Sequence, residues 1–160
     1  MPRYAAAAVL VALLAFPGVV MAATQQATPA VTQQGTPRAD DLTGTAGADR
    51  INGRGGNDTI RGRGGNDRLS GGRGDDLVSG DAGRDAIFGG PGNDTLLGGA
   101  GNDRISGGAG VDLIAGGAGN DVVRVRDGET DRVTCGAGRD RVVADAQDIV
   151  SRDCEVVERG

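Results

Sequence analysis

The sequence contains no histidine and no lysine, and aromatic side chains are almost absent. Of its 160 residues only Tyr4, Phe16 and Phe88 are aromatic, and all seventeen basic residues are arginine. Without histidine the chain cannot form a Ser-His-Asp triad or an HExxH zinc motif, and it cannot transfer protons through an imidazole. Without lysine it has neither a P-loop lysine nor a Schiff-base amine. These absences exclude several of the commonest enzyme classes.

Glycine, by contrast, is present in large excess, with 31 residues. Glycine loses more backbone entropy on folding than any other residue, and few large side chains are available to offset that loss by burial. An ordinary hydrophobic core is therefore not expected. The length permits one domain of average size at most.

The N-terminal part is typical of an exported protein. Arg3 precedes an apolar stretch from Ala5 to Val20, and small residues follow, which predicts a secretory signal peptide over residues 1–22. A transmembrane anchor is the alternative, but Pro17-Gly18 interrupts the apolar stretch, which is short for a bilayer span. We therefore expect no membrane span in the mature chain. Residues 23–43, rich in Thr, Gln, Ala and Pro without apolar periodicity, are predicted to be a flexible linker.

From Gly44 onward the sequence repeats every nine residues through nine consecutive units. In every unit the first and fourth positions are glycine, the sixth is aspartate and the eighth is aliphatic, and the unit from Gly89 to Leu97 shows the full pattern. Nine units without an exception at four positions cannot be an accident of composition. The position-six residues are Asp49, Asp58, Asp67, Asp76, Asp85, Asp94, Asp103, Asp112 and Asp121.

This pattern is the G-G-x-G-x-D-x-U-x nonapeptide that binds Ca²⁺ in RTX (haemolysin-type) proteins, which the chain resembles over residues 44–134. The resemblance implies an all-β fold, a right-handed parallel β-roll in which two nonapeptides make one turn. It also implies Ca²⁺ ions between successive loops on the same side, each bound by two position-six carboxylates and by loop carbonyls. Two ladders of carboxylates follow, one from Asp49 to Asp121 and one from Asp58 to Asp112. Their adjacent pairs would hold about seven ions.

The residue types agree with calcium chemistry. Nineteen of the 22 acids are aspartate, whose short carboxylate supplies the hard oxygen that Ca²⁺ prefers, whereas a transition metal would need histidine or clustered cysteine. Glycine at positions one, two and four allows a tight loop, and Asn or Asp at position five is expected to tolerate left-handed geometry. Some units have another residue at position two, and their sites are less favourable: these residues are Thr45, Arg54, Arg63 and Asp81.

The core of such a roll would be thin, since each unit buries only one aliphatic side chain. Burial of that size does not offset the entropy of ordering nine residues. Folding and calcium binding are therefore predicted to be one event. The alternative reading of the repeat is a flexible acidic linker, which is what we expect of the chain when calcium is absent.

The C-terminal part continues the pattern after one extra residue at Val125. Asp131 and Asp140 then extend the two ladders. Residues 135–160 are predicted to be a cap that closes the open edge of the roll, and they resemble the closing segment of secreted bacterial RTX-type proteins. Two cysteines in an exported chain, Cys135 and Cys154, most simply form a disulfide, with two free thiols as the alternative.

The two faces of the predicted roll differ in their outward residues, at positions seven and nine of each unit. One face carries Leu77, Leu97 and Leu113, and the other carries arginines in the same columns as Ala86 and Phe88. The arginines have two possible explanations. Either they keep the sheet face soluble and unpaired, or they attract an anionic polymer once bound calcium has reversed the net charge of −5. The arginines are Arg50, Arg68, Arg104, Arg124 and Arg141.

Taken together, these features predict a secreted, non-enzymatic calcium-binding protein, extracellular and in some settings associated with the cell surface. Two alternatives stay open. One is a calcium-gated module that binds an anionic polysaccharide of the cell surface or matrix. The other is an accessory domain of an extracellular polysaccharide-active enzyme, similar to the calcium-binding modules of alginate epimerases. Calcium ions are the expected partners, and no nucleic acid is expected.

Overall fold

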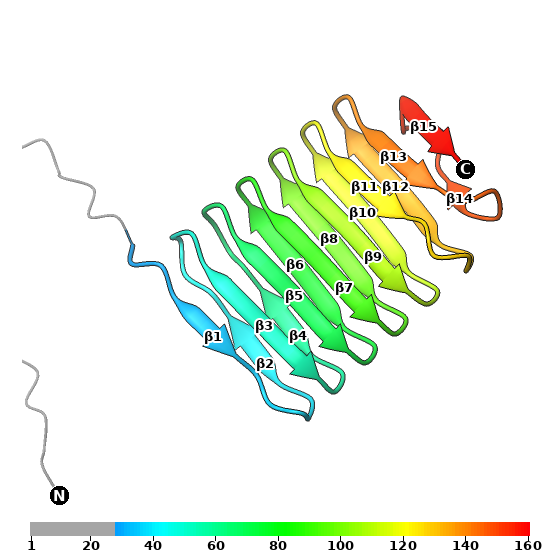
Figure 1. The fold of residues 1–160 in the computed structure, drawn as a ribbon. Helices are drawn as coiled ribbons and strands as arrows, with labels where there is room; N and C mark the ends of the chain where they lie inside the picture. Colours follow the sequence, from blue (N-terminus) through cyan, green and yellow to red (C-terminus); the bar gives the residue numbers. More distant parts are fainter. Residues whose placement is uncertain (1–27) are drawn as a thin grey trace, which may run out of the picture.

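The computed structural model describes residues 28–160, so the predicted signal peptide at 1–22 lies outside the described residues. Within this part every element is a strand, and no helix is long and apolar enough to cross a bilayer. The odd-numbered strands form one parallel sheet of eight and the even-numbered strands a second of seven (Figure 1). The first sheet contains β1 (Thr32–Gln34), β3 (Arg50–Gly55), β5 (Arg68–Arg73), β7 (Ala86–Pro91), β9 (Arg104–Ala109), β11 (Val122–Val125), β13 (Arg141–Ala144) and β15 (Val156–Arg159). The second contains β2 (Asp41–Thr43), β4 (Thr59–Arg61), β6 (Leu77–Ala82), β8 (Thr95–Ala100), β10 (Leu113–Ala118), β12 (Arg132–Ala137) and β14 (Ile149–Val150).

The chain alternates between the two sheets, so each turn of about two nonapeptides adds one strand to each. Residues eighteen apart are paired, as in Arg50 with Arg68 and Leu77 with Thr95. Where the turn includes Val125 the separation becomes nineteen, as in Val122 with Arg141, because the extra residue extends β11 and pairs with Ala144. In the last turn it falls to seventeen between β12 and β14 and to fifteen between β13 and β15. The predicted parallel β-solenoid is confirmed, with about seven turns.

The core is a narrow file of aliphatic side chains between the two sheets. Each turn contributes one buried residue from each of the two sheets, because position eight is the middle of a three-residue strand segment and points inward. The position-eight members of this core are Ile51, Ile60, Leu69, Val78, Ile87, Leu96, Ile105, Ile114, Val123, Val133 and Val142. The thin core that the repeat predicts is therefore present.

The roll begins earlier in the chain than the sequence suggested. Strands β1 and β2 pair with β3 and β4 within the segment 23–43 that was expected to be a flexible linker. Here Gly35, Asp40 and Leu42 occupy positions one, six and eight of a further unit, and Leu42 packs against the core. This unit has Arg38 in place of the glycine at position four, which hides the repeat in the sequence.

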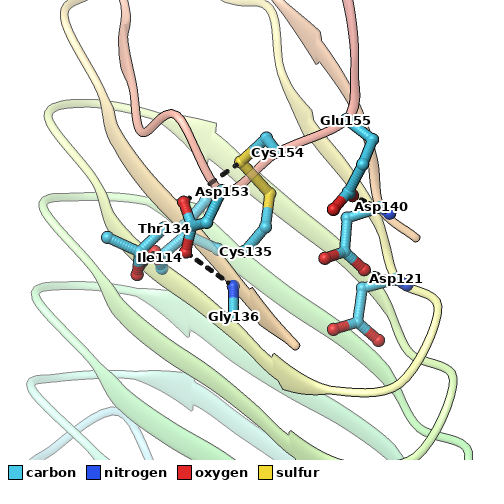
Figure 2. Close-up of a disulfide and its surroundings, with 9 residues drawn as sticks. All are labelled: Ile114, Asp121, Thr134, Cys135, Gly136, Asp140, Asp153, Cys154 and Glu155. Carbon is cyan, nitrogen blue, oxygen red and sulfur yellow. Dashed lines mark hydrogen bonds between the residues drawn. A yellow bond between two sulfur atoms is a disulfide. The ribbon is translucent and has the colours of Figure 1, made fainter. Parts of the chain in front are cut away.

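The C-terminal end of the roll is closed by a disulfide, as predicted. Cys135 in β12 is bonded to Cys154 in the turn before β15, with 5.2 Å between their Cα atoms (Figure 2). Beside it the Asp153 carboxylate accepts a hydrogen bond of 2.8 Å from the Gly136 N–H. These contacts attach the last strand to the body of the roll.

Candidate metal sites along the roll

Each predicted metal-binding aspartate directly precedes a strand, so the aspartates form two columns, one before the strands of each sheet. All eleven are at most 3% exposed. Within a column the backbone N–H of one aspartate donates to Oδ1 of the next: Asp67 to Asp85 at 2.7 Å and Asp85 to Asp103 at 2.8 Å. The first ladder contains Asp49, Asp67, Asp85, Asp103, Asp121 and Asp140, and the second contains Asp58, Asp76, Asp94, Asp112 and Asp131.

Three further acids continue these ladders and were missed in the sequence. Asp40 donates its N–H to Asp58 at one end of the second ladder, and Asp148 accepts from Asp131 at the other. Glu155 accepts from Asp140, and Figure 2 shows it stacked in one column with Asp140 and Asp121. Of the three, only Asp40 could have been recognised in the sequence, because it lies nine residues, one repeat period, before Asp49. The other two follow their partners by 17 and 15 residues, outside the period.

The second carboxylate oxygen, Oδ2, has no partner in most rungs of the ladders. A buried polar atom without a hydrogen bond is costly and rare in native proteins, so a regular series of them requires an explanation. A hard cation that is bound between turns would supply the missing partner. The ten buried Oδ2 atoms without a hydrogen bond belong to Asp58, Asp67, Asp76, Asp85, Asp94, Asp103, Asp112, Asp121, Asp131 and Asp140.

The glycine at position one keeps the space around this oxygen open. A Cβ atom built on Gly80 would lie less than 3.0 Å from both Asp85 Oδ2 and the carbonyl oxygen of Gly98 in the next turn. Gly89 stands in the same relation to Asp94 and Gly107. The partnerless carboxylate oxygen and a backbone carbonyl oxygen thus face the same small space, which any side chain at position one would fill.

The left-handed backbone conformations fall at positions two and four. Gly72 and Gly74 illustrate them, with φ of 119° and 124°. At position two three units place a larger residue in this unfavourable region, and these are Arg54, Arg63 and Asp81, with φ between 67° and 79°. This explains why position two is glycine in most units.

Position five has a different role from the one predicted. Among the described residues no Asn or Asp at this position has a positive φ, so the expected left-handed geometry is wrong. Its side chain bonds the next turn instead: Asn66 Oδ1 accepts the N–H of Arg84, and Asn93 Oδ1 accepts that of Val111, both at 2.9 Å. A short amide at this position therefore adds a second connection between turns.

The first rung of each ladder has its own hydrogen-bond donor for Oδ2. In the first ladder the Thr45 N–H and hydroxyl donate to Asp49 Oδ2, at 2.5 and 3.2 Å. In the second ladder Thr36 does the same for Asp40, at 2.6 and 3.0 Å. At the N-terminal end of the roll, threonine at position two thus donates hydrogen bonds to the aspartate Oδ2. In the central rungs the same oxygen has no partner.

The ladders are electrostatically unfavourable when no cation is bound. Burial, followed by repulsion from Asp103 and Asp67, raises the pKa of Asp85 to about 7, although a backbone hydrogen bond opposes this shift. For the same first reason, burial, the pKa values of Asp94 and Asp131 are raised to about 6. A divalent cation would reverse this preference for the neutral carboxyl, because it stabilises the ionised form.

The geometry determines what kind of ion fits. Among residues 28–160 no three acidic or cysteine side chains gather in one cluster. A bound ion must therefore take one or two carboxylates from neighbouring rungs and complete its shell with backbone carbonyls. This all-oxygen set fits Ca²⁺ and does not fit a transition metal.

Comparison with known proteins agrees with this chemistry. The family described as the RTX calcium-binding nonapeptide repeat (4 copies) matches three overlapping segments, residues 34–69, 61–96 and 88–123, which together cover more than half of the chain. None of the curated proteins matches it. The nonapeptide period, the parallel roll and the buried aspartate ladders have one common explanation: the chain belongs to the family of RTX repeat proteins, whose nonapeptides bind Ca²⁺.

Proposed function

We propose that this chain is a secreted, non-enzymatic calcium-binding protein. It would bind about seven Ca²⁺ ions between successive rungs of the nine regular units, from Asp49 to Asp121 in one ladder and from Asp58 to Asp112 in the other. The observation that carries the proposal is the series of ten buried Oδ2 atoms without a partner. The ligands would be the position-six carboxylates of these rungs, together with carbonyls such as that of Gly98, which faces Asp85 Oδ2. RTX repeat proteins are generally secreted, in agreement with the predicted signal peptide.

Coupled folding and binding follows from the same ladders. In the folded chain without metal, each partnerless oxygen raises the free energy, and the single file of aliphatic residues offers little to compensate. Calcium binds only where two turns have come together, so it stabilises the folded state alone. The ion is therefore proposed to act as a structural component of the roll.

The proposal is tested by removing calcium. In EDTA the mature chain should be largely disordered by far-UV circular dichroism, and added Ca²⁺ should restore the β spectrum cooperatively with a midpoint of about 10⁻⁴–10⁻³ M. Mg²⁺ should substitute poorly, because it demands compact octahedral geometry and retains its water. Equilibrium dialysis then counts the bound ions. A native β spectrum that excess EDTA leaves unchanged would refute the proposal.

A second candidate function is the binding of an anionic polymer, and the outer face of the eight-stranded sheet favours it. The strand register places Arg50, Arg68 and Arg104 in one outward column, as the sequence predicted. The same face would serve if the chain were the accessory domain of a polysaccharide-active enzyme. Retention on acidic polysaccharide with Ca²⁺ but not with EDTA would support this function. Equal retention in both conditions would argue against it.

A further inference from the structure

The outer face of the eight-stranded sheet contains a hollow at the centre of its arginine column. Strands β5, β7 and β9 lie side by side and place Arg68, Ala86 and Arg104 in one row. Because alanine is small, a hollow of about 220 Å³ forms between the two arginines, with Phe88 also in its lining. The hollow thus combines three arginines, since Arg124 also lines it, with an apolar floor and an aromatic ring.

The charges around this hollow have no counter-ions among residues 28–160. In the described part of the chain only Arg126 and Arg141 have a carboxylate within 4.0 Å. Arg50 and Arg68 face each other on adjacent strands, an arrangement of like charges that destabilises a sheet. Solubility alone does not require arginines to be aligned in this way, whereas an anionic ligand would make the alignment favourable.

Phe88 holds one of these arginines in position. The guanidinium carbon of Arg68 lies 4.6 Å from the centre of the Phe88 ring, within the range of a cation–π interaction. The ring is half-buried and the Arg68 side chain exposed. A guanidinium that is fixed against a ring loses less entropy when it binds, and its planar donors match a carboxylate.

We propose that this hollow binds a short stretch of hexuronic acid units of an acidic polysaccharide, with the carboxylates of two of these units at Arg68 and Arg104 and a sugar ring over Ala86. Arg68 and Arg104 are two strands apart, about 10 Å from strand spacing. This distance is close to the length of two sugar rings in an extended chain, so carboxylates of one polyuronate can reach both arginines. The site rests on the proposed function, because at neutral pH calcium is what would bring strands β5, β7 and β9 together.

A single-stranded nucleic acid is the competing ligand, since aromatic rings and arginines also bind bases and phosphates. Base stacking needs an open aromatic face, and Arg68 already covers one face of Phe88. Phe88 is also the single aromatic residue among residues 28–160, so successive bases would find no further platform. The structure therefore favours the sugar.

The test is calorimetric titration of the calcium-loaded chain with a short hexuronate oligosaccharide at constant free Ca²⁺. The double variant Arg68→Ser/Arg104→Ser should bind at least about tenfold more weakly, because each substitution removes a charge-assisted hydrogen bond to a carboxylate. The matched control is Arg61→Ser/Arg132→Ser, which removes the same charge from exposed positions on the other sheet. Its affinity should change less than about twofold, and Phe88→Ala should weaken binding to an intermediate extent.

Circular dichroism with and without Ca²⁺ accompanies each titration, so that two kinds of failure are distinguishable. A parent chain that folds on calcium but does not bind the oligosaccharide would overturn the hollow and leave the proposed function standing. A chain that does not fold on calcium would overturn the proposed function itself. The hollow is also refuted if both double variants lose affinity equally, or if a methyl-esterified oligosaccharide or a single-stranded oligonucleotide binds at least as tightly.

Discussion

At the scale of the residue, the two oxygens of each position-six aspartate have separate roles. Oδ1 accepts the N–H of the preceding turn, so it contributes to the stacking of turns without any ion. Oδ2 has no protein partner in the central rungs, whereas in Asp49 it accepts from Thr45. The rungs are thus unequal, and substitution of a central and of a terminal aspartate should have different effects.

Asp85→Asn should remove about two bound ions, because Asp85 has a rung on either side, Asp67 and Asp103. Asparagine keeps an Oδ1 acceptor for the Asp67 N–H, so the change tests the charge at Oδ2 rather than the fold. Asp49→Asn is the matched control and should remove one ion at most. Bound calcium per chain, measured by equilibrium dialysis, checks this. Equal losses in the two variants would argue against ions shared between rungs.

Position two offers a stabilising substitution. Arg63 has a φ of 77°, a backbone conformation that costs an L-residue about 1–2 kcal/mol. Glycine would avoid this strain, but it loses more backbone entropy on folding, so only part of the strain energy is regained. Arg63→Gly should therefore stabilise the calcium-loaded roll by about 0.5–1 kcal/mol in urea unfolding. Arg61→Gly, two residues away in β4, should destabilise it by a similar amount. Destabilisation by both would show that the left-handed conformation carries no cost.

At the scale of the element, no strand of this roll could be stable alone. The strands contain two to six residues, and each strand from β3 to β13 buries only one or two hydrophobic side chains in the core. Stability therefore depends on stacking and on how the two ends are closed. The N-terminal end is covered by β1 and β2, and the C-terminal end by β14, β15 and the disulfide.

The disulfide should contribute measurably to the C-terminal end. Cys135 and Cys154 are 19 residues apart, and closing a loop of this length stabilises by about 3 kcal/mol in the chain-entropy model. The double variant Cys135→Ser/Cys154→Ser should need more calcium to fold, with the midpoint from circular dichroism shifted upward. Reduction of the parent chain provides the control and should produce the same shift. An unchanged midpoint in both would mean that β15 stays attached without the bond.

At the scale of the whole molecule, charge dominates the balance between folded and unfolded chain. The net charge is −5, and the buried carboxylates are stacked in two columns. Without calcium, burial raises the pKa of the central aspartates, so the metal-free roll binds protons more readily than the unfolded chain. Protons and calcium thus stabilise the same fold by different means, and they compete for the same oxygens.

Metal-free protein should therefore gain β structure when the pH is lowered from 8 to 5. Protonation of a carboxyl whose pKa is raised in the folded state stabilises the fold, and this stabilisation is complete when the pH is below 3.8, the pKa in the unfolded chain. It is lost as the pH rises through about 6 to 7, the folded-state pKa values of Asp94 and Asp85. At limiting calcium the opposite should hold, with affinity falling on acidification. Circular dichroism of calcium-stripped protein across this range checks the sign. A β signal that decreases on acidification would contradict it.

The sequence determined the parallel all-β roll through the resemblance of its nonapeptides to RTX repeats, and with it the two ladders including Asp131 and Asp140 and the face that carries the arginines. This was possible because a period of nine, with inward and outward residues alternating along each short strand, places every position of a unit without further information. The disulfide followed from there being two cysteines in a chain predicted to be exported.

Only the tertiary structure decided the features that depend on contacts between turns. These features are the first turn before Gly44, the addition of Asp148 and Glu155 to the ladders, and the hollow over Ala86. They all depend on contacts between residues 15 to 18 positions apart. The position-five bonds have the same origin. Local sequence specifies which way a side chain points, but whether a neighbouring turn supplies its partner depends on the register between strands, which is established only when the turns stack.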